Sequence, residues 1–363
     1  MKVLIVFNHP APYKIRLFNE LAKSVDLTVI FERGASKNRN PLFYQQNEIQ
    51  FKCIFLKGIN ISDENHFSFG VVRHLKKNKY DLIIINGYST FSEMLALRYL
   101  HRNKIPYAMY VNGGVIRNDS KFKFKVKKSL VSGAKLYLSP SPEVNSYLVH
   151  YGAQAERIVN YPYSTIFEKE IAPAVLSQIE KAEIRKDHNF PGKTIFVSAG
   201  QFIERKNFME LLEIWKTQPN DRTLILIGDG EELANYTSYL KENKLSNVII
   251  LPFMVTDDLF EIFRASDAFI LLSKEDIYGH VINEAMSQGL PVISSDRVVA
   301  AQHLITNDIN GFLVDYKNPE DVKKRIEDVI GKNFGDAPLK TARENTIEKM
   351  AEVHVRIFEE AIK

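Results

Sequence analysis

The sequence has a single cysteine, Cys53, among its 363 residues. One cysteine excludes an internal disulfide and is typical of a protein that stays in a reducing cytosol. The chain also lacks any apolar run of the roughly 18–20 residues that a membrane-spanning helix needs. Residues 1–7 are too short an apolar stretch for a secretory signal and are typical of a first strand. We therefore expect a soluble cytoplasmic protein that is at most peripheral to the inner face of a membrane.

Acidic residues are scarce in the first half of the chain. Residues 1–165 carry 24 Lys and Arg against 11 Asp and Glu, a balance of +13, whereas the remainder has 24 against 33, a balance of −9. Such a split indicates that the first half meets something anionic. Zinc-ligand spacings, aromatic RNA-binding signatures and helix-turn-helix patterns are missing, which argues against nucleic acid. An anionic membrane surface or a diphosphate-bearing substrate fits better.

The length exceeds what one core usually organises, so two domains are expected. Short apolar runs alternate with amphipathic helical segments in both halves, which predicts parallel sheets with helices on both faces. The predicted boundaries are a first Rossmann-like domain over residues 1–165, a linker over 166–190, a second Rossmann-like domain over 191–345 and a final helix over 346–363. The linker assignment depends on the mixed charge and the three prolines of residues 161–191.

The stretch 273–296 carries the most specific pattern, S-K-E-D-I-Y-G-H-V-I-N-E-A-M-S-Q-G-L-P-V-I-S-S-D. The apolar run 268–272 predicts a buried strand before it. A helix is expected over 281–287, ended by Gly289 as its C′ residue and by Pro291. Ligands of open parallel sheets bind beyond the carboxyl ends of the strands. The loop 274–280 is therefore a candidate binding loop.

Two carboxylates mark this stretch. Asp276 lies in the loop, and Glu284 follows eight positions later among apolar helix residues, where a carboxylate can accept two hydrogen bonds from a sugar diol. With these acids and the Gly289–Pro291 turn, the stretch resembles the donor-binding signature of family 4 retaining glycosyltransferases. The resemblance implies that Glu284 holds the ribose of a nucleotide sugar and that Asp276 meets the transferred sugar. The family more often has Glu at the first position, so a shift by one residue to Glu275 stays open.

A second part of the donor site is expected after the predicted strand at 194–198. Arg205 and Lys206 precede a helix predicted at 208–216, and two cations before a helix N-terminus suit a diphosphate. The resemblance agrees, because Lys206 matches the family lysine that grips the donor phosphates. We expect Arg205, Lys206 and Asp276 to be the catalytic residues. The expected donor-binding set is Gly200, Arg205, Lys206, Gly228, Phe253, Glu275, Asp276, Tyr278, Gly279 and Glu284.

Acceptor-side residues are expected in the first domain. His9 and Tyr13 follow the predicted strand at 2–7, and Asn112 and Gly113 follow the one at 107–111. His9 is read either as a substrate contact or as an incidental loop histidine. In the family a His commonly precedes the glycine in the loop after this strand. Here Asn112 takes that position, so the resemblance does not assign the role of the family His to a residue of this sequence.

A basic segment at 121–130 has two interpretations. Five lysines surround Phe122, Val126 and Leu130, which share one face of a helix. A helix of this type can lie on anionic lipid. It can equally be a solvated helix that packs through the same apolar face.

The resemblance covers nearly the whole chain and implies a GT-B fold, with two domains facing across a cleft and the last helix crossing back to the first. It implies a retaining hexosyltransferase-type enzyme that moves a sugar from a UDP- or GDP-sugar to a saccharide acceptor. Because no Asp-x-Asp motif occurs, we expect no metal and no cofactor. A lipid-linked acceptor in bacterial capsule, O-antigen or other polysaccharide assembly is expected. Alternatives are a soluble acceptor, a nucleotide-sugar epimerase of related fold, and a non-catalytic GT-B binding protein.

Overall fold

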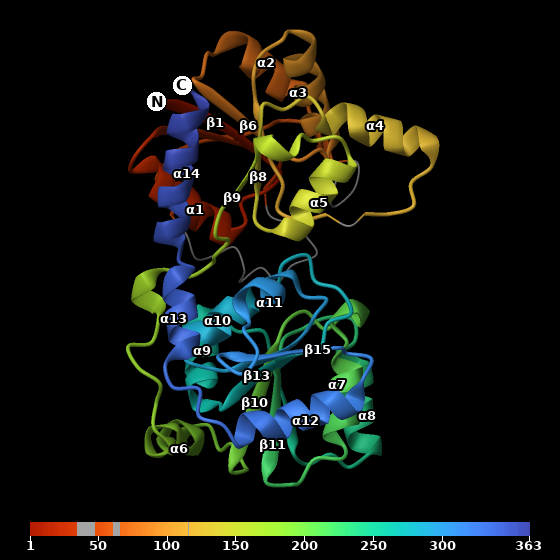
Figure 1. Cartoon of the computed structure of the whole chain (residues 1–363), viewed down its shortest axis with the longest axis vertical. Coiled ribbons are helices and arrows are strands. Elements are labelled where there is room, and N and C mark those ends of the chain that lie inside the picture. The colour runs from red at the N-terminus through yellow and green to blue at the C-terminus, as the bar shows by residue number, and fades with distance from the viewer. Residues whose placement is uncertain (35–47, 61–65, 115) are drawn as a thin grey trace. The chain divides into compact units, whose positions relative to one another are not determined.

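The computed structural model describes residues 1–34, 48–60, 66–114 and 116–363. It divides into two compact units: unit 1 comprises Met1–Ser164 with Ile347–Lys363, and unit 2 comprises Thr165–Thr346. Each unit contains a parallel sheet flanked by helices, as Figure 1 shows, and this is the Rossmann-like architecture that the sequence predicts. No helix in the described parts of the chain is long and apolar enough to cross a membrane.

The main sheet of unit 1 is built from apolar runs. Residues 3–7 of its first strand, for example, are all buried, as expected for a parallel strand covered on both faces. The strands pair in the order β3-β2-β1-β6-β7-β8-β9. Their bounds are β1 (Lys2–Phe7), β2 (Asp26–Phe31), β3 (Lys52–Phe55), β6 (Leu82–Asn86), β7 (Ala108–Tyr110), β8 (Leu136–Ser139) and β9 (Ile158–Asn160), with a separate antiparallel pair β4 (Ile59–Asn60) and β5 (His66–Phe67).

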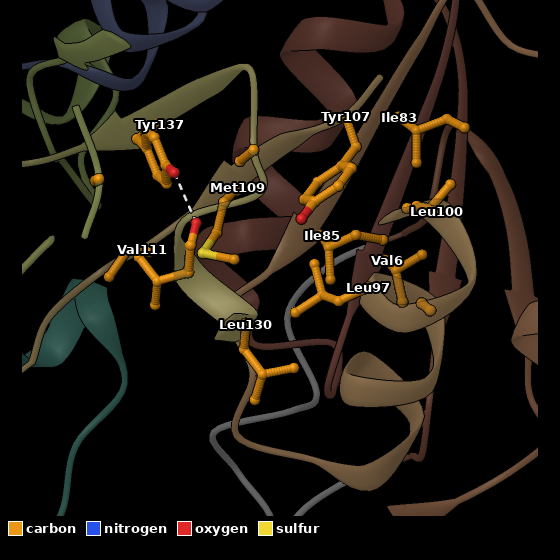
Figure 2. Close-up of a cluster of buried hydrophobic side chains, with 14 of the residues drawn as sticks. Val6, Ile83, Ile85, Leu97, Leu100, Tyr107, Met109, Val111, Leu130 and Tyr137 are labelled. Carbon is orange, nitrogen blue, oxygen red and sulfur yellow. Dashed lines mark hydrogen bonds between the residues drawn. The ribbon is translucent and has the colours of Figure 1, made fainter. Parts of the chain in front are cut away.

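The helices of unit 1 are α1 (Pro12–Ala22), α2 (Gly70–Lys77), α3 (Phe91–Arg102), α4 (Lys121–Val131), α5 (Pro142–His150) and α14 (Ile347–Ala361). One core joins the sheet to α2, α3 and α5, and Figure 2 shows part of it, with Ile85 of β6 and Met109 of β7 near Leu97 of α3. Helix α14 packs against α1, far from it in sequence (Figure 1). The predicted return of the final helix to the first domain is confirmed.

Unit 2 has the six-stranded order β12-β11-β10-β13-β14-β15. The order reverses between β10 and β13, and such a reversal creates the crevice in which open α/β sheets bind ligands. The strands are β10 (Thr194–Ala199), β11 (Arg222–Ile227), β12 (Val248–Leu251), β13 (Ala268–Leu271), β14 (Val292–Ser295) and β15 (Gly311–Val314). The helices are α6 (Gln178–Asp187), α7 (Phe208–Trp215), α8 (Leu233–Glu242), α9 (Thr256–Ala265), α10 (Val281–Ser287), α11 (Val299–Leu304), α12 (Pro319–Ile330) and α13 (Ala337–Glu344).

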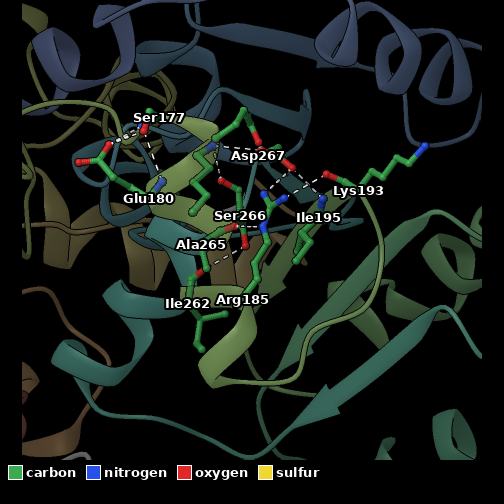
Figure 3. A network of polar contacts seen from close by, with 11 residues as sticks. Ser177, Glu180, Arg185, Lys193, Ile195, Ile262, Ala265, Ser266 and Asp267 are labelled. Atoms are coloured by element: carbon green, nitrogen blue, oxygen red, sulfur yellow. Dashed lines mark hydrogen bonds and ion pairs between the residues drawn. The ribbon is translucent and has the colours of Figure 1, made fainter. Parts of the chain in front are cut away.

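The segment predicted as a linker, 166–190, lies within unit 2 and carries helix α6. A capping box of Ser177 and Glu180 starts this helix. An ionic network then holds it against the sheet (Figure 3). Asp267, just before β13, accepts hydrogen bonds from Lys181 Nζ at 3.1 Å and Arg185 Nη2 at 2.8 Å. The inward side of α6 is thus cationic rather than apolar, and apolar periodicity does not reveal its packing.

Candidate functional site

The predicted donor residues follow the carboxyl ends of neighbouring strands of unit 2. Gly200, Arg205 and Lys206 come after β10, Gly228 after β11, Phe253 after β12, and Glu275, Asp276, Tyr278 and Gly279 after β13; Glu284 is in the first turn of α10. Because β10 lies between β11 and β13, the loops carrying these residues surround the point where the strand order reverses. Phe253, half buried beyond the edge strand β12, is the outermost of them.

Lys206 and Asp276 form the centre of this edge. Their side chains are bonded as an ion pair, Nζ to Oδ2, and both residues are buried at 8% exposure. Lys206 ends a short 3-10 helix, Glu204–Lys206, and Asn207 then turns the chain through a left-handed conformation into α7. A buried cation and carboxylate, each the other's partner, make a compact polar centre that an anionic ligand can compete for.

Arg205 is more exposed than Lys206 and reaches the same carboxylate. Its Nη1 lies 3.7 Å from Asp276 Oδ1 and donates to the carbonyl of Glu275 at 3.3 Å. The backbone joins the two loops as well, since the N–H of Lys274 donates to the carbonyl of Arg205 at 2.9 Å. The structure therefore brings together both predicted cations and the predicted acid.

The side chains of Glu275 and Asp276 are placed differently. Asp276 forms an isolated parallel bridge with Val298, and its N–H donates to the carbonyl of Arg297 at 3.1 Å. The side chain of Glu275 is exposed. Within unit 2, Asp276 is thus the acid that faces Lys206. This geometry favours the register that the sequence assigns to Asp276 over the alternative at Glu275.

Glycines allow close backbone approach at this edge. A Cβ at Gly228 would lie 2.0 Å from the carbonyl oxygen of Gly200, so the loops after β10 and β11 meet main chain to main chain. Gly279 has φ +93°, and a Cβ there would lie 2.4 Å from Val298 Cγ1. A side chain at either position would push the loops apart.

Glu284 is half buried in the first turn of α10. Its Oε1 accepts a hydrogen bond from Thr165 Oγ1 at 2.8 Å. The sequence gives no signal for Thr165, because the residue lies 119 positions away in a segment without a motif. Its hydroxyl fixes one oxygen of the carboxylate that the resemblance assigns to ribose.

The predicted acceptor-side residues lie at the same edge of the sheet of unit 1. His9 follows β1, Tyr13 is in the first turn of α1, and Asn112 with Gly113 follows β7. All four are half buried. Asn112 connects β7 with β6, since its Nδ2 donates to Asn86 Oδ1 at 3.0 Å.

Sequence reasoning missed two neighbouring buried carboxyl groups, one of which interacts with Asn86. Glu32 follows β2 and Glu93 lies in the first turn of α3; both are fully buried, and Thr90 Oγ1 donates to Glu32 Oε1 at 2.7 Å. Burial raises the pKa of Glu32 to about 7. Burial and the neighbouring Glu32 raise the pKa of Glu93 well above its usual range. At neutral pH we therefore expect this pair to hold at least part of a proton.

A buried lysine of unit 1, Lys14, was also missed. It lies three, four and seven residues before Leu17, Phe18 and Leu21, which are buried on the inward face of α1. That spacing is the signal that places Lys14 on the same face. Among the described residues no group of three or more His, Cys, Asp and Glu side chains is arranged to hold a metal ion.

Two family models match the chain. Residues 14–160 match "Glycosyltransferase Family 4" and residues 180–350 match "Glycosyl transferases group 1". The chain is 32% identical over 139 residues to the lipopolysaccharide core biosynthesis glycosyltransferase LpsE of Rhizobium meliloti, and 30% identical over 149 residues to the amylovoran biosynthesis glycosyltransferase AmsD of Erwinia amylovora. These alignments cover 38% and 39% of this chain but span only 40% and 41% of the relatives' own length.

A likeness in fold extends over the whole chain. The crystal structure of Anabaena HepE in complex with UDP superposes with a TM-score of 0.80 at 16% identity, covering 99% of this chain and 100% of that one. With the two parallel-sheet units, this likeness shows the GT-B fold.

Proposed function

We propose that this chain, which belongs to the family 4 glycosyltransferases of the GT-B fold, moves a sugar from a nucleotide diphosphate sugar to a saccharide hydroxyl. The observation that carries the proposal is the buried Lys206–Asp276 pair at the strand-order reversal of unit 2, with Arg205 beside it. Cations at that point suit a diphosphate, and a carboxylate suits sugar hydroxyls. UDP is the nucleotide bound by HepE, and it is therefore the first donor base to test here.

The chemistry demands stabilisation of the negative charge that grows on the departing diphosphate. In our proposal the ammonium of Lys206 leaves Asp276 and pairs with the donor phosphates, and the guanidinium of Arg205 also binds these phosphates. The freed Asp276 carboxylate then accepts from hydroxyls of the transferred sugar, while Glu284 accepts from the ribose. The proposed transfer retains the anomeric configuration, as the resemblance to the family implies. It needs no metal in this proposal, because Arg205 and Lys206 meet the charge of the diphosphate.

The proposed acceptor is a lipid-linked saccharide of bacterial polysaccharide assembly. Its support is the +13 balance of residues 1–165, together with the names of LpsE and AmsD, which refer to lipopolysaccharide core and amylovoran biosynthesis. A lipid diphosphate is an anionic partner of the kind that a basic domain attracts.

The proposal is tested by a thermal-shift screen with UDP, GDP and their common sugar conjugates. A ligand at 100 times its dissociation constant should stabilise the protein by about 2.7 kcal/mol. The conjugate that binds is then incubated with and without acceptor saccharides. Transfer only with acceptor supports the proposal, whereas consumption of the donor sugar by inversion at a ring carbon without acceptor would indicate an epimerase. Absence of any nucleotide-dependent shift would contradict the proposal.

Asp276→Ala should weaken binding of the nucleotide sugar more than Glu275→Ala does. Asp276 is buried against Lys206, whereas the Glu275 side chain is exposed. Only the change at Asp276 therefore removes a carboxylate that is held in a fixed position. The expected difference is about 1–3 kcal/mol, the cost of leaving buried polar groups unpaired. Isothermal titration with the conjugate found in the screen measures both affinities. The reverse order would assign the sugar contact to Glu275.

Helix α4 is the proposed membrane contact of unit 1. Phe122 is 77% and Val126 40% exposed, whereas Leu130 is buried, so the single apolar face expected from the sequence is divided between solvent and core. Lys127 is not free, because Asp119 and the Tyr151 hydroxyl hold its ammonium at 2.7 and 3.1 Å. The outward part of α4 therefore presents two apolar side chains among its exposed lysines.

Replacing Lys121, Lys123 and Lys125 with Glu should abolish binding to vesicles that contain acidic lipid. These lysines are exposed, and each basic residue near such a surface contributes about 1 kcal/mol. Vesicle co-sedimentation at increasing salt measures the effect, since the attraction falls off within about 8 Å at physiological ionic strength. The matched control reverses Lys76, Lys77 and Lys79, which are exposed on and just after α2. Equal losses in both triple variants would contradict a specific role for α4.

A further inference from the structure

Lys14 is a fully buried lysine that meets no carboxylate in the described parts of unit 1. Its exposure is 0%. Its Nζ lies 3.0 Å from Asn112 Oδ1 and 3.3 Å from the Tyr110 hydroxyl. The rings of Tyr110 and Tyr163 have their centroids 4.3 and 4.5 Å from it. The rings of Phe7 and Tyr13 lie 5.6 and 5.7 Å away, so the amine is enclosed by two polar acceptors and four aromatic rings.

Stability does not account for this lysine. Burial lowers the pKa of its ammonium well below the usual range, which reflects the free-energy cost of removing the charge from water. Aromatic faces and neutral acceptors recover part of that cost, but an apolar side chain of the same length would avoid it altogether. The function of Lys14 therefore has to be sought in the groups that it contacts.

The first of these groups is the Asn112 amide, whose orientation the structure fixes. Its Oδ1 accepts from Lys14 and from the Tyr161 hydroxyl at 2.9 Å, and its Nδ2 donates to Asn86 Oδ1. A flipped amide would place N–H groups against two donors. Oδ1 already accepts two hydrogen bonds and one of the two Nδ2 hydrogens is used. The side chain of Asn112 therefore has one N–H left to donate.

The second group is the Tyr110 hydroxyl, which links Lys14 to helix α14. The hydroxyl lies 2.9 Å from His354 Nε2, and His354 Nδ1 lies 2.7 Å from the carbonyl oxygen of Met350. Burial lowers the pKa of His354 to about 3, so the ring is neutral. The carbonyl requires the proton on Nδ1, hence Nε2 accepts from Tyr110, and the Tyr110 oxygen accepts from Lys14. The hydrogen bonds from Lys14 through Tyr110 to His354 therefore all run in the same direction.

We propose that Lys14 is a positioning residue for the acceptor saccharide: together with Tyr161 it locks the Asn112 amide so that the free Nδ2 hydrogen is offered to a sugar oxygen at the carboxyl end of β7. The inference rests on the proposed function. Asn112 serves as a donor and not as an acceptor toward the sugar, because its amide oxygen already accepts from Lys14 and Tyr161.

The kinetic test compares Lys14→Met with Lys23→Met, the same change at an exposed lysine that caps the C-terminus of the same helix. The assay uses octyl glycosides as acceptors and the nucleotide sugar found in the screen. Lys14→Met should raise the acceptor KM by up to about tenfold, roughly the effect of losing the hydrogen bond from the Asn112 amide to the sugar, with little change in kcat and no fall in Tm. Asn112→Ala should raise KM similarly, and the double variant no further. Should Lys14→Met fail to fold, Tyr161→Phe tests the same amide and should raise KM in the same way.

A second measurement needs no substrate. In protein labelled with 15N-asparagine, the side-chain amide pair of Asn112 is assigned by its absence in Asn112→Ala. It should shift in Lys14→Met and stay in place in Lys23→Met. An unmoved Asn112 resonance, an unchanged acceptor KM, or additive effects in the double variant would each overturn the inference. A wild-type protein without transfer activity would refute the proposed function, while the resonance would still decide whether Lys14 orients Asn112.

Discussion

Lys206→Met is expected to lower sugar transfer by about 10²–10³-fold, the usual effect of deleting one donor aimed at charge that develops in the transition state. Lys206 is buried and paired with Asp276. In the proposed reaction its ammonium meets the diphosphate whose charge grows as the sugar leaves. Binding of the free nucleoside, which carries no phosphate, should change far less. Turnover under saturating donor and titration with uridine or guanosine measure the two effects.

The matched control for this variant is Lys274→Met. Lys274 belongs to the loop after β13, is 41% exposed and pairs with Glu204 at 3.1 Å, so its loss should leave transfer nearly unchanged. Lys206→Met also removes the closest partner of the buried Asp276 carboxylate and leaves Arg205 at 3.7 Å. The double variant with Asp276→Asn removes that charge, and it should recover stability but not turnover. Equal losses in the two methionine variants, or complete loss of wild-type activity in EDTA that manganese restores, would contradict the proposed role.

Asp267→Asn is expected to destabilise unit 2 by about 3–5 kcal/mol, the typical cost of breaking a buried ion pair from one side. Asp267 meets Lys181, Arg185 and the N–H of Ile195, the last at 2.8 Å (Figure 3). Without the carboxylate, two buried cations remain uncompensated. Trp215 is the only tryptophan of the chain and is buried in unit 2, so its fluorescence during urea unfolding reports on this unit.

The control and the pH dependence sharpen this prediction. Glu261→Gln removes an exposed pair between α9 and His188, just after α6, with Nε2 3.0 Å from Oε1, and should cost at most about 1 kcal/mol. Burial tends to raise the pKa of Asp267, but Lys181 and Arg185 outweigh it and hold the pKa below its ordinary value. The carboxylate therefore stabilises the fold above its unfolded pKa of about 3.9, and this contribution is lost as pH falls through the lower folded value. The account would be contradicted if wild type remained more stable than Asp267→Asn at low pH. It would also be contradicted if Asp267→Asn lost no more free energy of unfolding than Glu261→Gln does.

Local sequence signals predicted the donor edge well because its elements are defined by short-range rules. Gly289 ends α10 with φ +85°, as a C′ glycine should, and Val292 opens β14 just beyond Pro291. The apolar runs of β10 and β13 likewise identify buried parallel strands. The positions of Lys206 and Asp276 follow from these elements and from the strand order.

Long-range contacts explain what the sequence did not predict. Arg185 and Asp267 lie 82 residues apart, so nothing local marks α6 as part of unit 2. Helix α4 turns Phe124 inward, with its ring 5.8 Å from that of Tyr151, whereas apolar spacing alone favoured the face of Phe122. Lys14 lies on the buried face of α1, where a charged side chain is not expected from the sequence. In each case a partner distant in sequence decides the environment.

The discontinuity of unit 1 has a consequence for synthesis. Helix α1 packs against α14, and the buried chain from Lys14 through Tyr110 ends on His354 of α14. On the ribosome, residues 347–361 emerge only after all of unit 2 has been made. Unit 1 therefore stays incomplete, with one side of α1 exposed, until α14 has been synthesised. This differs from the general tendency of domains to fold in the order of their synthesis. Unit 2, a continuous segment, can complete its core first, and a nascent chain stopped before residue 347 should expose to chaperones the side of α1 that α14 covers.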